Sequence, residues 1–224
     1  MVCRGTGHPE LLDALAGAIA AGPGLTILDA GCGMGGPGAW LRRKTGCRTV
    51  GVDLMEANVS AARRLFGDES SLVASASALP FAAECFDAAW AIGVIEMIED
   101  KPSAFAEVAR VLKTGGAMAI YTFTSAGDLV DPPESDRFVS ADELGEAIGS
   151  AGLAVVDARP LPIRSPLPED WRASRAAVAD EIRARHSSER EYVQVTGELA
   201  RFNRLRTTGQ IEAWRFTLRK EAAA

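Results

Sequence analysis

The sequence lacks the features that mark membrane, secreted and metal-binding proteins. It contains no run of about 18 apolar residues, so no membrane-spanning helix is predicted. Residues 11–21 are interrupted by Asp13 and do not form the apolar core of a signal peptide, and we therefore expect a cytoplasmic protein. The four cysteines form no Cys-x-x-Cys pair and only two histidines are present. We expect reduced cysteines and no metal site.

A basic surface charge is also missing. Lysine and arginine together number 24 against 30 aspartates and glutamates, and the net charge is -6. Nucleic-acid-binding proteins usually carry the opposite balance, so no nucleic-acid partner and no membrane partner are expected. With 224 residues, 47% of them hydrophobic, the chain has the length and composition of one α/β domain.

Short apolar runs alternate with amphipathic segments along most of the chain, which predicts an open, mostly parallel sheet with helices on both faces. The predicted strands are 25–30, 47–53, 71–75, 86–92, 117–123, 153–161 and 210–220. The predicted helices are 8–21, one opening at 39–44, 56–66, 102–113, 140–151, 169–185 and 188–207. We interpret 1–224 as a single domain, divided into a helical segment (1–24), a cofactor-binding core (25–161), a helical insert or lid (162–208) and a final strand (209–224).

A glycine-dense turn follows the first predicted strand. Five of the eight residues from 31 to 38 are glycine, and the spacing Gly31-x-Gly33-x-x-Gly36 satisfies the dinucleotide-binding pattern, with Asp53 twenty residues after Gly33. On spacing alone an NAD site is open. Asp29, however, stands at the tip of the strand, where a carboxylate would repel a pyrophosphate and attract an ammonium group. S-adenosylmethionine, which carries an ammonium group and a ribose diol, fits this turn better.

Four motifs in order resemble the class I S-adenosylmethionine-dependent methyltransferase family of the small-molecule type, and the resemblance covers nearly the whole chain. They are Leu28-Asp-Ala-Gly-Cys-Gly-Met-Gly, Val52-Asp-Leu54, Ala78-Leu-Pro-Phe with Cys-Phe-Asp-Ala-Ala-Trp90, and Val111-Leu-Lys-Thr-Gly-Gly116. The resemblance implies a Rossmann-like, seven-stranded sheet with a helical insert before the last strand. It also implies S-adenosylmethionine as the cofactor and no metal.

The same resemblance implies roles for particular residues. Gly31 and Gly33 would let the backbone pack against the methionine and ribose parts of the cofactor, with Asp29 near its amino-acid end. Asp53 would accept both ribose hydroxyls, unless it only caps the following helix. The remaining predicted cofactor contacts are Cys32, Leu54, Met55, Ser75, Ala76, Ser77 and Ala91. Ser75 stands where many relatives carry an aspartate that binds adenine, so a weaker grip on the base is expected.

The catalytic residue is not identified by the sequence. Glu96-Met97 follows the fourth strand where many relatives have Glu-His, so Glu96 is the one candidate base there, and it could equally be a structural acid. We expect His8 and His186 to be surface residues, although each could reach a site from a lid. Tyr121 is expected in the core.

The acceptor is expected to be a small organic molecule, because Ala91-Ile-Gly-Val94 replaces the Asn-Pro-Pro-Tyr-type motif of many nucleic-acid and protein-amide methylating relatives. Its pocket would be built from 125–139, the helical pair 169–208 and the N-terminal segment. Trp171, Tyr192 and Phe202 of the helical pair could wall the pocket, with an arginine such as Arg172 or Arg175 holding an acidic acceptor. The helical pair could instead pack against the sheet or against a second copy in a homodimer. Two alternatives remain: a cofactor-binding protein of this fold that does not methylate, and an NAD-dependent oxidoreductase.

Overall fold

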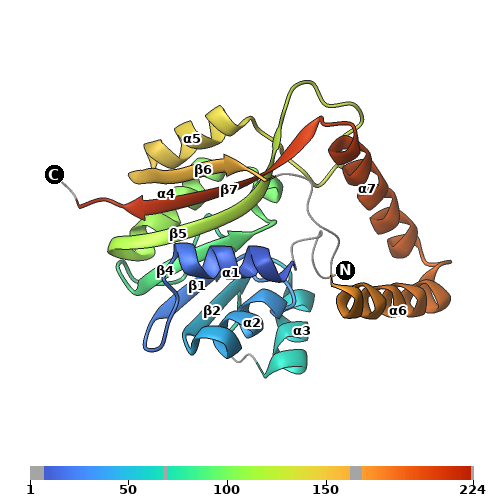
Figure 1. The fold of residues 1–224 in the computed structure, drawn as a ribbon, viewed down its shortest axis with the longest axis horizontal. Helices are drawn as coiled ribbons and strands as arrows, with labels where there is room; N and C mark the ends of the chain where they lie inside the picture. The colour runs from blue at the N-terminus through green and yellow to red at the C-terminus, as the bar shows by residue number, and fades with distance from the viewer. Residues whose placement is uncertain (1–7, 68–69, 162–167, 223–224) are drawn as a thin grey trace.

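The computed structural model describes residues 8–67, 70–161 and 168–222, and these form one layered α/β body with a helical arm (Figure 1). The helices are α1 (Pro9–Ala18), α2 (Gly36–Thr45), α3 (Glu56–Phe66), the short 3-10 helix η1 (Ile95–Met97), α4 (Lys101–Val111), α5 (Ala141–Ser150), α6 (Glu169–His186) and α7 (Arg190–Thr207). The strands are β1 (Thr26–Ala30), β2 (Arg48–Asp53), β3 (Leu72–Val73), β4 (Phe86–Ile92), β5 (Leu112–Ser125), β6 (Leu153–Pro160) and β7 (Ile211–Lys220).

The strands form one seven-stranded sheet in the order β3-β2-β1-β4-β5-β7-β6. All neighbouring pairs are parallel except those of β7, which runs antiparallel to both β5 and β6. The predicted mostly parallel sheet, with a helical insert before the last strand, is therefore confirmed. The order changes direction at β1, where β2 lies on one side and β4 on the other, and ligands of open α/β sheets bind beyond the strand ends at such a point.

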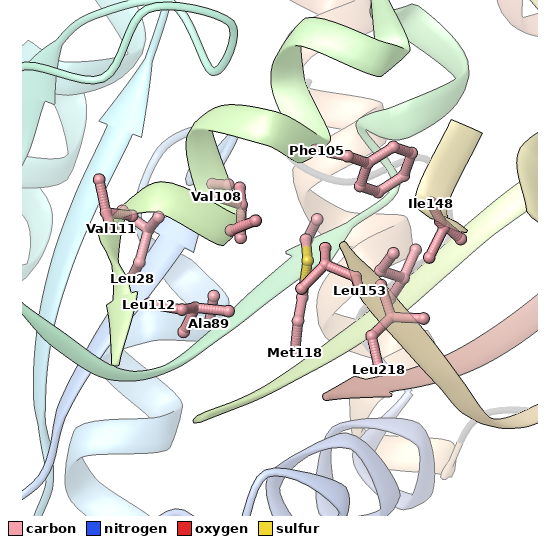
Figure 2. Close-up of a cluster of buried hydrophobic side chains, with 14 of the residues drawn as sticks. Leu28, Ala89, Phe105, Val108, Val111, Leu112, Met118, Ile148, Leu153 and Leu218 are labelled. Atoms are coloured by element: carbon pink, nitrogen blue, oxygen red, sulfur yellow. The ribbon is translucent and has the colours of Figure 1, made fainter. Parts of the chain in front are cut away.

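Two apolar layers cover the two faces of the sheet. On one face, shown in Figure 2, side chains of α4 and α5 pack on β1, β4 and β5. Phe105, Val108 and Ile148 meet Ala89 and Met118 there. On the other face, α1 and α2 pack around the buried side chain of Trp90. Because both faces are covered, β4 is apolar from Ala88 to Ile92, as buried parallel strands usually are.

Several element boundaries were predicted well and others were wrong. The strand 86–92 and the helix 56–66 have their predicted limits. Helix α2, however, begins at Gly36 and not at residue 39, because Gly35 adopts the left-handed conformation (φ 80°) and Pro37 fits the first turn of a helix. The strand predicted over 71–75 is shorter, since only 72–73 pair with β2.

The largest error concerns the start of β5. A helix was predicted over 102–113 and a strand over 117–123, with the pair Gly115-Gly116 between them, but α4 stops at Val111 and the strand begins at the next residue. The register between β4 and β5 shifts between the pairs Phe86–Leu112 and Ala88–Ala117, so the extra residues form a bulge. Gly115 lies in this bulge with φ +78°, a conformation that glycine adopts without strain.

Helices α6 and α7 form the arm, which extends beyond the sheet edge at which β5 ends and β7 begins (Figure 1). Helix α6 buries none of its side chains, and α7 buries only Phe202 and Leu205. The ring of Phe202 packs edge-on against Phe123 of β5, with 4.8 Å between the ring centroids. The arm is thus attached to the body through the last turns of α7. Within the part of the chain that the structure describes, no helix is long and apolar enough to cross a membrane.

Candidate cofactor site and acceptor side

The predicted cofactor residues lie at the C-terminal ends of the parallel strands. Strands β1, β2 and β4 are parallel, so the segments after Ala30, Asp53 and Ile92 all leave the sheet on the same side. The N-terminal end of α1 and the arm lie on this side too (Figure 1). The structure therefore brings together the glycine turn, the acid after β2 and the loop after β4, as the motif order predicts.

The glycine turn is held by backbone hydrogen bonds to β2. The amides of Gly31 and Cys32 both donate to the carbonyl of Val52, at 2.8 and 2.9 Å. Gly31 has φ +75°, and a Cβ built on it would lie 2.4 Å from Cγ2 of Val94 in the loop after β4. Only glycine permits this close approach, which brings the turn and the β4 loop together at the end of β1.

Asp53 is tied to this turn by its side chain. Its Oδ2 accepts a hydrogen bond from the amide of Gly33 at 2.9 Å. Its Oδ1 accepts from the amide of Met55 and from the side-chain amide of Asn58, both at 2.9 Å. The carboxylate is therefore fixed in orientation at the end of β2. Its bond to the Met55 amide lies at the start of α3, so it also supports that helix end.

Asp29 points toward the start of α2. It is buried, and a Cβ built on Gly38 would lie 2.9 Å from its Oδ2, so the missing side chain at Gly38 leaves room for the carboxylate. A carboxylate beside the first turn of a helix is favoured by the helix dipole. Asp29 thus lies beneath the glycine turn, next to the residues predicted to contact the cofactor.

The predicted adenine side is open to solvent. The side chains of Leu54 and Met55 are exposed by 75% and 59%. Ser75 Oγ accepts a hydrogen bond from the amide of Ser77 at 3.2 Å, and Ser77 Oγ donates to the carbonyl of Asp100 at 3.3 Å. The two serines therefore hold the loop after β3, with Ala76 between them.

Glu96 lies in the interior, with 1% of its surface exposed. Its Oε2 accepts a hydrogen bond from the hydroxyl of Thr122 at 2.8 Å, and its backbone carbonyl accepts from the amide of Arg137 at 2.6 Å. The ammonium of Lys101 donates to the carbonyls of Ile98 and Arg137, at 2.7 and 2.6 Å. These bonds fasten η1, β5 and the segment 126–140 to one another.

The charges of this cluster affect one another. Burial lowers the pKa of Lys101, and the nearby carboxylates of Glu96 and Asp136 act in the opposite direction. A buried ammonium needs such carboxylates, because an unpaired charge is costly in the interior. The surroundings of Glu96 are those of a structural acid, which is one of the two roles that the sequence left open.

The two histidines differ in their surroundings. His186 lies at the end of α6, exposed, with Nδ1 2.8 Å from Glu189. His8 was expected at the surface and this was wrong: 5% of it is exposed, at the start of α1. A signal was available in the sequence, since His8 directly precedes Pro9 and the apolar face of α1. Tyr121 is buried, as expected, and packs against Phe123.

The predicted acceptor wall is only partly assembled. Phe202 packs on Phe123 and Phe138 at the root of the arm, whereas Trp171 is 38% exposed. The arginines named as candidates for an acidic acceptor, Arg172 and Arg175, are exposed on α6. No group of three potential metal ligands occurs among the described residues.

Comparisons with known proteins bear on this site. Residues 28–120 match the family model of a methyltransferase domain. Methyltransferase GfsG of Streptomyces halstedii is 39% identical over 114 residues, covering 48% of this chain and 41% of the relative. O-methyltransferase cnsE of Penicillium expansum is 32% identical over 145 residues, covering 58% and 52%. The chain thus spans about half the length of the curated relatives that it matches.

Solved structures extend the likeness over the whole fold. The [4+2]-cyclase SpnF has a TM-score of 0.77 at 24% identity, covering 96% of this chain and 81% of its own. Geranyl diphosphate C-methyltransferase from Streptomyces coelicolor A3(2), solved with Mg2+, geranyl diphosphate and S-adenosyl-L-homocysteine, has a TM-score of 0.70 at 24% identity, covering 94% and 77%. At this identity the two structures establish the shared fold.

Proposed function

We propose that the chain transfers a methyl group from S-adenosylmethionine to a small organic acceptor. Residues 28–120 match a methyltransferase domain, and the strands have the order β3-β2-β1-β4-β5-β7-β6 with β7 antiparallel, which supports the proposal. The cofactor supplies an electrophilic methyl group on a sulfonium. The chain's part is to bind it, to align the acceptor with it and to exclude water, which accounts for much of the rate of such a displacement.

The observation that carries the proposal is the carboxylate of Asp53, fixed beside the glycine turn. Its two oxygens offer four acceptor positions, of which the donors Gly33, Met55 and Asn58 use three. One position is left for a ribose hydroxyl. The second hydroxyl takes the place of the Asn58 amide, which is the only one of the three donors carried by a side chain that can rotate. The acceptor positions of the Asp53 carboxylate therefore fit the two hydroxyl donors of a ribose diol.

The rest of the turn fits the other parts of the cofactor. The amides around Gly31, Cys32 and Gly33 form the surface against which the methionine part packs, with Asp29 toward its ammonium group. On the other side, the exposed side chains of Leu54 and Met55 flank the adenine. The remaining proposed contacts with the cofactor are Ser75, Ala76, Ser77 and Ala91.

The acceptor is proposed to bind over the ends of β4 and β5, between the N-terminal end of α1, the segment 125–139 and the arm. Among the relatives, two are described as O-methyltransferases, one as a methyltransferase of malonyl-[acyl-carrier protein] and others as sterol or squalene methyltransferases. Their acceptors differ widely, so the class of acceptor for this chain is defined by experiment. A homodimer formed through the arm stays part of the proposal.

Release of S-adenosylhomocysteine tests the proposal. The protein is incubated with S-adenosylmethionine and a panel of phenols, aliphatic alcohols, amines and carboxylic acids, and the product is quantified by mass spectrometry. We expect turnover with at least one acceptor. Cofactor binding without any turnover would favour the alternative of a protein that uses the fold for another purpose, as the [4+2]-cyclase with this fold does.

A further inference from the structure

Histidine 8 is buried in a way that its structural surroundings do not explain. Only 5% of the residue is exposed, and among the described residues neither Nδ1 nor Nε2 has a hydrogen-bond partner. Oε2 of Glu10 is 3.9 Å from Nδ1, beyond hydrogen-bonding distance. A buried polar group without a partner destabilises the fold, so its presence calls for another explanation.

The ring does not serve the helix at which it stands. His8 occupies the N-cap position of α1, but its side chain makes no capping hydrogen bond. The helix start is held by the backbone instead, because the carbonyl of His8 accepts from the amides of Leu11 and Leu12 at 3.0 and 3.1 Å. A phenylalanine or leucine could fill the same space without the cost of desolvating two ring nitrogens.

Its place in the fold is at the edge where the reaction is proposed to occur. Helix α1 packs on the face of β5 that carries Tyr121 and Phe123, and its N-terminal end lies at the edge where the parallel strands end (Figure 1). The loop after β4, which carries Gly93, is bonded to β5 there, since the amide of Gly93 donates to the carbonyl of Tyr121 at 2.8 Å. His8 is therefore at the start of a helix that covers the ends of β4 and β5.

We propose that the imidazole of His8 is the general base of the methyl transfer and that the acceptor carries a hydroxyl group. This inference rests on the proposed function. The acceptor oxygen forms a bond to the methyl carbon while the carbon–sulfur bond breaks and its electron pair stays on sulfur. The hydroxyl proton passes to a ring nitrogen of His8, and the imidazolium then releases it to water. Atoms and charge balance without any further reactant.

A base is needed because a neutral hydroxyl keeps its proton at neutral pH. Glu96 is bound to Thr122 in the interior, and His186 stands at the far end of α6, paired with Glu189. Of the two histidines, His8 is the one whose ring nitrogens are buried without a hydrogen-bond partner among the described residues, and it lies at the start of α1, beside the ends of the strands.

Two substitutions separate a base from a packing residue. His8→Phe fills the same space and removes the unpaired nitrogens, so the melting temperature should equal or exceed that of the native protein. His8→Gln keeps a polar group of similar length. Both should lower kcat about 100-fold or more, with KM for S-adenosylmethionine changed less than about threefold. The matched control is Asp13→Asn, on the outer side of α1 where Asp13 pairs with Lys44, and it should keep kcat within about twofold.

The pH profile and a spectroscopic signal provide readouts that a packing role would not move. If His8 is the base, kcat of the native protein should fall as the pH is lowered, and this dependence should be absent in His8→Gln. Because the chain has only two histidines, a protein labelled with 15N-histidine gives two sets of ring signals, which His186→Gln assigns. Addition of S-adenosylmethionine should shift the His8 signals and leave those of His186 in place.

The outcomes distinguish this inference from the proposed function. Native protein that turns over no hydroxyl acceptor but methylates an amine or a carboxylate refutes the role of His8 and leaves methyl transfer standing. Native protein without any turnover refutes both. Turnover of a hydroxyl acceptor by His8→Phe at the native rate, or an unmoved His8 signal on cofactor addition, refutes the role of His8 alone.

Discussion

Replacing Asp53 with alanine should weaken the binding of S-adenosylmethionine far more than it weakens the fold. A hydrogen bond to a charged group contributes about 1.5–3 kcal/mol. Losing that contribution to the ribose diol should raise the dissociation constant about 12- to 160-fold. The same substitution removes three internal bonds, but the amides of Gly33 and Met55 lie near solvent and can bind water. We therefore expect the free energy of unfolding to fall by only about 1–2 kcal/mol.

The matched control is Asp87→Ala, at the N-terminal end of β4 and therefore at the opposite end of the strands from the cofactor site. Asp87 also anchors a backbone amide, that of Thr26 at 2.8 Å, and pairs with Lys113 at 2.6 Å. Its loss should cost a similar amount of stability and leave cofactor affinity within about twofold. Isothermal titration calorimetry measures the affinity, and urea unfolding measures the stability. Equal affinities of native protein and Asp53→Ala, or an equal loss of affinity in both variants, would refute the assignment of Asp53.

Three further predictions concern Gly31 in the glycine turn, the buried acid Glu96, and the pH dependence of the stabilisation by Asp87. Gly31→Ala places a Cβ 2.4 Å from Val94 at φ +75°, and it should weaken cofactor binding at least about tenfold. The control is Gly67→Ala, where φ is +61° and no atom lies within 4 Å of the added Cβ. This control should lower only the free energy of unfolding, by about 1–3 kcal/mol. Glu96→Gln should lower the free energy of unfolding by about 1–3 kcal/mol and keep kcat within about threefold. A loss of kcat of about 100-fold in the folded variant would instead indicate that Glu96 is the catalytic base. The pKa of Asp87 is lowered by its lysine partner and a backbone amide, so its stabilisation is present above the ordinary aspartate range and is lost as pH falls toward the lowered value. As the pH is lowered from about 7 to about 3, the urea midpoint should therefore fall less steeply for Asp87→Asn than for the native protein.

Much of the fold could be predicted because local signals and burial agree in most elements. The apolar run of β4 and the helix 56–66, with Gly67 behind it, have strong signals and were placed correctly. The helix predicted over 140–151 is present as α5 and begins with a capping box of Ser140 and Glu143, with both reciprocal bonds present. The start of β5 was not, because a Gly-Gly pair favours a helix end and a strand bulge equally, and only the register with β4 decides between them.

The candidate site divides in the same way. The glycine turn and Asp53 are local in sequence, and the structure places them together as the spacing indicates. The burial of Glu96 depends on contacts with β5 and the segment 126–140, which no local pattern encodes. The expectation that His8 lies at the surface was wrong, although its place directly before Pro9 and the apolar face of α1 indicated burial.

The most direct test of the account is calorimetric titration of the native protein with S-adenosylmethionine and, separately, with NAD. The turn above Asp29 and the carboxylate of Asp53 predict one bound S-adenosylmethionine per chain, and heat of binding that is lost or strongly reduced in Asp53→Ala. Binding of NAD alone would contradict the assignment of the turn, and with it the proposed methyl transfer.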